Sequence, residues 1–338
     1  MNRVRYWDIA KGLAILLVIL GHAVELGKQG SDHPLHLFIY SFHMPLFMII
    51  SGYLFVQTLS RRTTKDILLK KIIQLLCPVF LFGTIEFFIV RFNPSLSLKE
   101  NLYFYYGTLV RTLWFLQALF FASMIYLFGE RFLKHSRLIY IALMLAFVFT
   151  PDLFKSAGTK FLFPCFLFGT CIAHYKWDKC DSKLLTTTFW ITCLLFILLL
   201  IPFDHSKTIY VHSVFIFSHD AGVLQLLVED IYRVLLGIAG SVVVLCAIIF
   251  LTRFNKPTKI GSLLSTIGKH TLGLYIAHFY LYVWVIAPLS HAFISDSASD
   301  IIVISSGFLV LLLASYPAAL IIEKGINAIP IPRTHESA

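Results

Sequence analysis

Charged residues are scarce in this chain of 338 residues. Asp, Glu, Lys and Arg make up 14% of it, whereas a soluble domain carries about 25%. Hydrophobic residues make up 58%, and the mean hydropathy is +0.81. Such a chain cannot hide that much apolar surface in its own interior, which excludes an ordinary soluble enzyme. We therefore expect an all-α, polytopic integral membrane protein, because helices satisfy their backbone polar groups within lipid.

Several functional signals are also missing. The six cysteines contain no CxxC pair and lie mostly inside apolar runs, which is typical of small core residues rather than ligands or disulfides. The thirteen histidines show no metal-binding spacing such as HExxH, so we predict no metal. The first apolar segment carries Asp8 and Lys11 and is followed by no small-residue cleavage site, so we expect it to be retained.

The basic residues predict a topology rather than a nucleic-acid partner. The net charge is +10, but the Lys and Arg residues lie in short loops between apolar runs and form no binding stripe. Counted over alternate loops, eighteen of them fall on one side of the membrane and seven on the other. The positive-inside rule then places both termini in the cytoplasm.

Apolar runs long enough to span a bilayer, about 17 to 25 residues each, occur ten times in what we expect to be a single membrane domain over 1–338. An eleventh stretch, 208–228, is too apolar for a loop, but as a span it would reverse the charge pattern. We interpret it as a re-entrant or interfacial segment on the outer face. The ten expected spans are 7–27, 35–57, 68–90, 102–128, 137–154, 159–175, 184–203, 229–252, 263–288 and 300–323.

The first expected span carries ionisable residues at membrane depth, where they are costly and mark functional sites. Lys11 and His22 are eleven residues apart, about three helical turns, so they share one face of the helix. Asp8 and Glu25 fall near the same stripe. A charged stripe must face protein or water. The plain alternative is a signal anchor that tolerates a few polar residues.

Depth along the helices separates two groups of ionisable residues. With the amino terminus inside, His22 lies roughly 22 Å into the first span, and His43 lies roughly 12 Å below the outer end of the second. Glu86 of the third span also falls toward the outside. The inner half instead holds Lys11, Lys70 and Lys71. This arrangement predicts a polar path with a basic inner mouth and an outer chamber lined by His and Glu.

The same residues carry a family resemblance. A basic residue, ten intervening residues and then His, here Lys11 to His22, resembles the opening motif of the acyltransferase-3 family of integral membrane proteins, in which Arg is the commoner basic residue. The stretch FHMPLFMIISGYLF at 42–55 is similar to the second motif of that family. Residues 112–120 and 272–282 resemble its later blocks, so the resemblance covers nearly the whole chain.

This resemblance implies an O-acetyltransferase in the cell membrane of a bacterium. The donor would be cytoplasmic acetyl-CoA, and the acceptor would be a sugar hydroxyl on a surface polysaccharide or a lipid-linked glycan. Association with glycan-assembly proteins stays open.

Each part of that chemistry has candidate residues. Lys11, Lys70 and Lys71 can receive the phosphates of the donor as point charges, although Lys70 and Lys71 also fit plain inside-positive anchors. An acceptor hydroxyl needs a base near physiological pH, and imidazole suits that task. His22 would take the proton, with Glu25 or Glu86 orienting its ring. A covalent acetyl-His route is equally open.

Five further residues are candidates, His43 for the catalytic group and the other four for contact with substrate, and each has a structural alternative. His43 precedes a Met-Pro pair and fits either the chamber or a helix cap. Ser51 is followed by glycine, which is typical of close helix packing. Trp114 fits packing or substrate stacking. Tyr275 and His278 are three apart and share a helical face, where they would line the chamber or form a structural hydrogen bond.

Two other function classes remain open at this point. Intramembrane His, Glu and Lys also mark the proton relays of transporters. Against a proton-coupled transporter, the sequence shows no Gly- or Pro-broken helices at matching positions in two halves. The other alternative is a non-catalytic scaffold that assembles glycan enzymes.

The predicted topology can be tested at position 256. In a protein whose native cysteines have been replaced, Lys256→Cys should react with a membrane-impermeant maleimide only from the cytoplasmic side, because it lies in a positively charged inner loop. Labelling from the outside of intact cells would overturn the topology.

Overall fold

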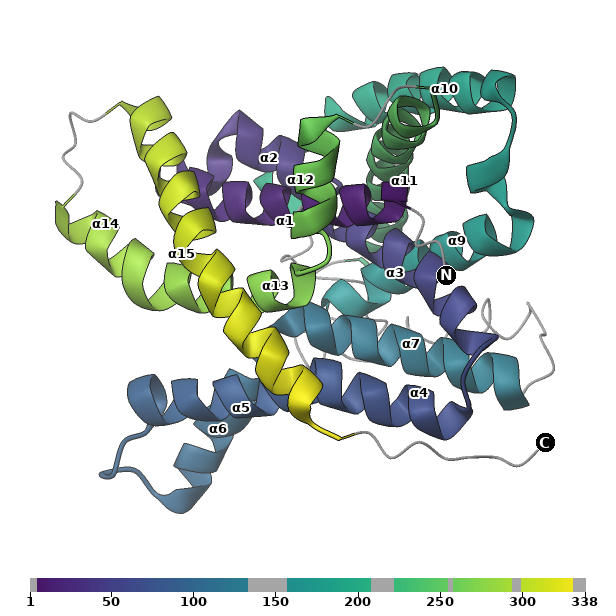
Figure 1. Cartoon of the computed structure of the whole chain (residues 1–338). Coiled ribbons are helices and arrows are strands. Elements are labelled where there is room, and N and C mark those ends of the chain that lie inside the picture. Colours follow the sequence, from purple (N-terminus) through teal and green to yellow (C-terminus); the bar gives the residue numbers. More distant parts are fainter. Residues whose placement is uncertain (1–4, 133–156, 208–221, 255–257, 294–298, 331–338) are drawn as a thin grey trace.

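The computed structural model describes residues 5–132, 157–207, 222–254, 258–293 and 299–330, and this part of the chain is helical throughout its regular structure (Figure 1). The expectation of an all-helical, polytopic membrane protein is confirmed. The α-helices are α1 (Arg5–Glu25), α2 (Pro34–Tyr40), α3 (His43–Leu59), α4 (Thr64–Lys71), α5 (Cys77–Glu86), α6 (Leu98–Arg111), α7 (Trp114–Phe132), α9 (Ala157–Tyr175), α10 (Ser182–Leu200), α11 (Val223–Phe254), α12 (Lys259–Ile267), α13 (Thr271–Leu281), α14 (Ala287–Phe293) and α15 (Asp300–Ala328).

Seven helical segments in the described ranges are long and apolar enough to cross a membrane, or eight if the bent pair α6 and α7 forms one span. These eight correspond to the first four and the last four of the predicted spans. The predicted span 159–175 is α9, whereas 137–154 lies outside the described residues. The total of ten therefore stays a prediction.

Three predicted boundaries need correction. The expected helix 102–128 is two helices, α6 and α7, which meet at an angle of 73°. The expected helix 263–288 is broken between α12 and α13, and α13 continues through a π-helical turn, Tyr282–Ile286, into α14. Of the segment 208–228, residues 208–221 lie outside the described part, and its last turns belong to α11, a helix of 32 residues. Hydropathy reports composition over a window, so it does not detect where a helix breaks.

Helix α1 lies against α12 so closely that backbone touches backbone. A Cβ atom at Gly12 would lie 2.0 Å from the carbonyl oxygen of Leu264, and one at Gly268 would lie 1.8 Å from that of Asp8. Small residues permit this approach, as is common between membrane helices. A Cβ atom at Gly273 of α13 would likewise lie 2.4 Å from the carbonyl oxygen of Ala319 in α15. These contacts fix α13 against both α1 and α15.

Helices α1 and α13 run in the same direction. Gly268, just before α13, lies against Asp8 near the start of α1. Tyr282, just after α13, donates a hydrogen bond to Glu25 at the end of α1. This direction is the one that the predicted topology requires of the first and ninth spans.

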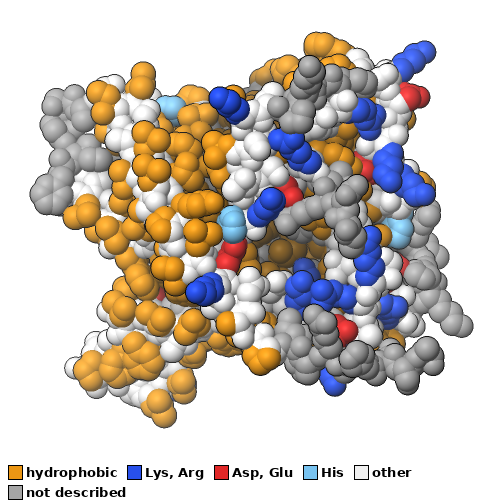
Figure 2. All heavy atoms as spheres, in the orientation of Figure 1, with side chains coloured by type: hydrophobic (Ala, Val, Ile, Leu, Met, Phe, Trp, Pro, Cys, Tyr) orange, Lys and Arg blue, Asp and Glu red, His pale blue; other side chains and the backbone are white. Residues whose placement is uncertain are grey.

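Charge is unevenly distributed over the surface. In Figure 2 the Lys and Arg side chains gather in one half of the face, over α4 and α12, whereas hydrophobic side chains dominate the half that holds α14 and the first part of α15. The basic half is hollowed near its centre. Such a separation is expected of a protein with one apolar belt and one positively charged side.

Among the described residues, three π-helical turns interrupt the helices, and each adjoins an ionisable or polar residue of interest. The turn Ile72–Leu76 follows Lys71, the turn Phe87–Arg91 follows Glu86, and the turn Tyr282–Ile286 begins at the tyrosine that contacts Glu25. Insertions of this kind frequently lie at functional sites because they reorient side chains within a helix.

The crossing of α3 and α9 depends on two glycines. A Cβ atom at Gly52 would lie 2.1 Å from the carbonyl oxygen of Phe166, and one at Gly169 would lie 2.0 Å from that of Ile49. Within the Ser51-Gly52 pair, the glycine therefore permits the close packing of α3 against α9. Ser51 is half-buried on α3.

We expect Gly52→Ala to destabilise the protein, because its added methyl group would collide with backbone atoms that cannot move independently. Overpacking typically costs about 1 to 3 kcal/mol. Gly107 of α6 offers a matched control, since nothing lies within 4 Å of its ideal Cβ position. Gly107→Ala should be neutral or stabilising, because alanine favours helix by about 0.5 to 1 kcal/mol. Thermal unfolding in detergent measures both, and equal effects would contradict the packing account.

Candidate active site

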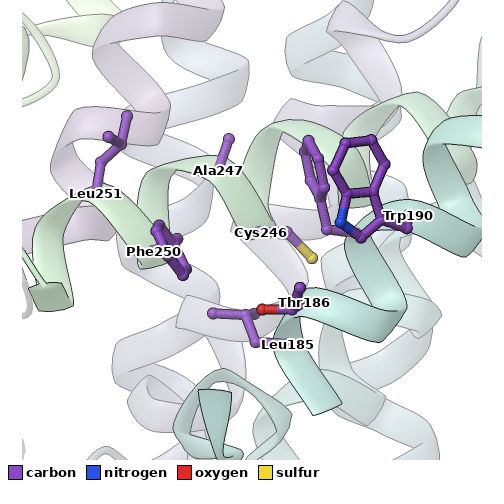
Figure 3. Close-up of a pocket in the computed structure, with 8 residues that line it drawn as sticks. Leu185, Thr186, Trp190, Cys246, Ala247, Phe250 and Leu251 are labelled. Carbon is purple, nitrogen blue, oxygen red and sulfur yellow. The ribbon is translucent and has the colours of Figure 1, made fainter. Parts of the chain in front are cut away.

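Two cavities of similar size differ completely in chemistry. The first, of about 350 Å³, is a groove between α10 and α11 (Figure 3). Its walls are mainly aliphatic and aromatic, and its polar lining atoms come from Thr186, Cys246 and Trp190. Because it offers neither a base nor a charged group, it has no means of catalysing proton transfer.

The second cavity, of about 330 Å³, collects ionisable and aromatic side chains from α1, α2, α3, α7 and α13. Six residues that the sequence indicated lie around this one space, although they come from four separate helices. Its lining is Val18, His22, Glu25, Tyr40, His43, Met44, Trp114, Tyr275, His278 and Phe279.

Glu25 is the centre of a hydrogen-bond network. Its carboxylate lies 3.1 Å from Nδ1 of His22, one turn earlier on the same helix, and 3.1 Å from Nε2 of His36. It also accepts hydrogen bonds of 2.8 Å from the hydroxyl groups of Tyr40 and Tyr282. Both carboxylate oxygens therefore have two partners each. A carboxylate removed from water needs such donors, because burying an unpaired charge is very costly.

This network fixes the tautomer of His22. An ionised carboxylate only accepts hydrogen bonds, so Nδ1 of His22 carries the hydrogen that Glu25 accepts. The lone pair of a neutral ring then lies on Nε2, the nitrogen that can take a proton. The His22 side chain is 20% exposed, in contact with the cavity. A tilted ring contact with Tyr282, at 4.7 Å between ring centroids, also restricts the His22 ring.

His43 and His278 have the same arrangement on the other walls. Nδ1 of His43 lies 2.8 Å from the carbonyl oxygen of Ile39, and Nδ1 of His278 lies 2.7 Å from that of Leu274. A carbonyl accepts, so each Nδ1 donates and each Nε2 holds a lone pair. Nε2 of His278 is buried with no partner in the protein. Each of these two histidines therefore both bonds to the backbone and lines the cavity, which the sequence had offered as alternatives.

Three residues of the network escaped the sequence reasoning: His36, Tyr40 and Tyr282. His36 and Tyr40 are one turn apart on α2 and stack at 3.7 Å between ring centroids. Tyr282 extends the face of Tyr275 and His278 by one more turn. His36 and Tyr40 have the helical spacing i and i+4, and Tyr275, His278 and Tyr282 have the spacing i, i+3 and i+7. A search of the sequence for His and Tyr on one helical face would have found both sets.

Two residues predicted for the catalytic and substrate-binding groups lie away from this lining. Glu86 accepts a hydrogen bond of 2.6 Å from the hydroxyl of Thr112, so the structure does not bring it to His22. Ser51 lies on α3 beside the α9 crossing rather than among the cavity residues. Depth in the membrane was a poor guide for Glu86 because it fixes only one of three coordinates.

The predicted donor-side lysines lie toward the other end of the helices. Lys11 forms an ion pair of 2.9 Å with Asp8 near the start of α1. The ammonium group of Lys71 lies 5.2 Å from the ring centroid of Phe55, a cation–π contact. Lys70, its neighbour at the end of α4, is half-buried. The three lysines that the sequence predicted to bind the donor phosphates thus have different surroundings.

No group of three or more His, Cys, Asp and Glu side chains in the described ranges is arranged to hold a metal ion.

Comparison with known proteins identifies the family of the chain. Residues 4–322 match the family model described as an acyltransferase domain. The chain belongs to this acyltransferase family. The match extends over nearly all of the chain, including every helix that lines the cavity, and the earlier resemblance is confirmed.

Two relatives carry the name nodulation protein NolL. The one from Mesorhizobium japonicum is 29% identical over 81% of this chain and 75% of its own length. The one from Sinorhizobium fredii is 27% identical over 81% of this chain and 77% of its own length. No solved structure matches the chain.

Proposed function

We propose that this acyltransferase moves an acetyl group from cytoplasmic acetyl-CoA to a hydroxyl group of a surface polysaccharide or lipid-linked glycan in the bacterial cell membrane. The observation that carries the proposal is the orientation of the His22 ring. Its Nδ1 donates a hydrogen bond to Glu25, which leaves Nε2 with a lone pair on a residue that lines a cavity of about 330 Å³. A carboxylate that fixes the tautomer of an imidazole base is the arrangement that acyl transfer uses elsewhere.

In the direct route, Nε2 of His22 takes the proton of the acceptor hydroxyl as its oxygen attacks the thioester carbonyl. The bond between the carbonyl carbon and sulfur then breaks, and the departing thiolate receives the proton from His22. Glu25 stays ionised and stabilises the imidazolium between these two steps. In the covalent route, Nε2 itself attacks the carbonyl, the carbon–sulfur bond breaks and the thiolate leaves. The acceptor hydroxyl then attacks the acetyl group, the carbon–nitrogen bond breaks, and the hydroxyl proton passes to Nε2 and from there to the thiolate.

The other walls of the cavity suit a sugar. Nε2 of His43 and of His278 can each accept a hydrogen bond from a hydroxyl group, because each Nδ1 already donates to a backbone carbonyl. A sugar hydroxyl would satisfy the unpartnered Nε2 of His278. Trp114 and Tyr275 add two aromatic side chains to the same cavity. Glycans present both hydroxyl groups and apolar ring faces, so this lining supports a glycan acceptor.

The donor would approach from the basic side of the molecule. The hollow in Figure 2 lies where Lys and Arg side chains gather, and the phosphates of acetyl-CoA carry the opposite charge. Lys70 and Lys71 end α4 on this side. Lys11 is already paired with Asp8, so we expect it to contribute less than either. The proposed partners are therefore acetyl-CoA inside, a glycan acceptor outside and the surrounding bilayer.

We expect His22→Ala to abolish acetylation while the protein remains inserted and at normal abundance. Removing a general base typically lowers the rate about a hundredfold to ten-thousandfold. The measurement is transfer of label from acetyl-CoA to the surface glycan of the producing strain, in membrane vesicles. Thr186→Val, in the apolar groove between α10 and α11, is the matched control and should retain activity. A His22→Ala protein within threefold of the wild type would leave the mechanism without its base.

The same assay separates the other function classes. A transporter would move an unmodified solute without transferring label, and a scaffold would do neither.

Lys70→Gln and Lys71→Gln should each raise the apparent KM for acetyl-CoA by about tenfold, because a hydrogen bond to a charged group contributes about 1.5 kcal/mol. Their effect on kcat should be smaller. Lys65→Gln removes the same charge from an exposed position of the same helix and serves as the control. If only the apparent KM for the glycan changes, the assignment of these lysines to the donor is wrong.

A further inference from the structure

The break between α6 and α7 is a strained turn inside the protein. The two helices meet at 73°, with Thr112 and Leu113 between them. Leu113 has φ of +47°, in the left-handed region, and its side chain is fully buried. Such a conformation costs roughly 1 to 3 kcal/mol in a residue other than glycine and persists only where the surroundings impose it.

The side chain of Gln117 satisfies the end of α6. Its Nε2 donates to the carbonyl oxygens of Leu109 at 2.8 Å, Thr112 at 2.9 Å and Val110 at 3.3 Å. The last carbonyl groups of a helix have no partner within that helix, and leaving them bare at membrane depth is expensive. Gln117 therefore joins the first turn of α7 to the last turn of α6 across the break.

A second contact anchors the turn to a neighbouring helix. The hydroxyl of Thr112 donates to the carboxylate of Glu86, at the end of α5, at 2.6 Å. This bond accounts for a carboxylate that lies outside the lining of the His22 cavity.

The residue that follows the turn is Trp114, which lines the His22 cavity. Phe115 then packs against Tyr275 and Phe47, each at 5.7 Å between ring centroids. Hydrogen bonds to Gln117 and Glu86 thus hold the turn on one side, and the packing of Phe115 against Tyr275 of α13 holds it on the other. The position of the Trp114 side chain follows from where this turn is held.

We propose that Gln117 and the Thr112–Glu86 pair are positioning residues of the acceptor site: they hold the strained turn so that Trp114 forms the wall on which a sugar ring of the acceptor stacks. This inference rests on the proposed function and names a subsite within it. It assigns Glu86 a role through Trp114, rather than contact with the reacting atoms. Gln117 and Glu86 then affect how well the acceptor binds, not how fast the acetyl group is transferred.

The test uses Gln117→Met, which keeps the length of the side chain and removes the donor, and the pair Thr112→Val and Thr112→Ser. The full-length protein in vesicles is assayed with labelled acetyl-CoA and an oligosaccharide fraction of the surface glycan. Gln117→Met and Thr112→Val should raise the apparent KM for the oligosaccharide about tenfold, with kcat and the KM for acetyl-CoA within about twofold of the wild type. Thr112→Ser keeps the hydroxyl and should restore the wild-type value.

A double-mutant cycle shows whether Gln117 acts through Trp114. Trp114→Ala should also raise the KM for the oligosaccharide. In that background Gln117→Met should have no further effect, because the wall it positions is gone. Additive effects of the two substitutions, or an equal loss of kcat in Gln117→Met and Thr112→Val, would overturn the proposal in favour of a purely structural role.

A readout without catalysis separates this proposal from the proposed function. In a protein whose other four tryptophans are replaced by phenylalanine, acrylamide quenching of Trp114 fluorescence should at least double in Gln117→Met and stay unchanged in Thr112→Ser. Unchanged quenching in Gln117→Met would refute the positioning role, even if the wild type transfers acetyl groups. Absence of label transfer by the wild type would instead refute the proposed function.

Discussion

A carboxylate inside a membrane protein must be surrounded by hydrogen-bond donors, and the arrangement around Glu25 follows from that requirement. Its four donors come from the end of α1, from α2 and from the turn that follows α13. Removing one donor would leave a charge partly unpaired, so the three elements are held together by one group. The cavity lies beside the point where these donors converge, and Glu25, His22 and Tyr40 line it.

Glycine contacts set the frame in which this convergence occurs. Gly268 brings the start of α13 against α1, Gly273 brings α13 against α15, and Tyr282 returns to Glu25 at the other end. Helix α13 is therefore fixed at both ends relative to α1. His22 and His278 face each other across the resulting space, at 5.5 Å between ring centroids. In lipid, where apolar surfaces gain little by meeting, such close backbone contacts carry much of the helix association.

Interrupted helices bring polar chemistry to the cavity. Trp114, which directly follows the break at Leu113, lines the cavity, and Tyr282, the first residue of a π-helical turn, donates its hydroxyl hydrogen to Glu25. Each interruption exposes backbone groups that the membrane does not solvate, so side chains such as Gln117 must supply the missing hydrogen bonds. Polar residues near a break therefore first satisfy backbone hydrogen bonds. The geometry of the active site depends on these bonds because they fix where the interrupted helices lie.

The sequence by itself determined the class of the protein and the contents of single helices. Low charge and long apolar runs predicted a helical membrane protein, and spacing along one helix placed His22 and Glu25 together. Only the tertiary structure decided which distant residues join them: His36, Tyr40 and Tyr282 bond to Glu25, whereas Glu86, predicted from its depth alone, bonds to Thr112. Periodicity specifies the depth of a side chain and its rotation about its own helix axis. The lateral order and the breaks of the helices depend on contacts between segments far apart in the chain, and no local pattern encodes those contacts.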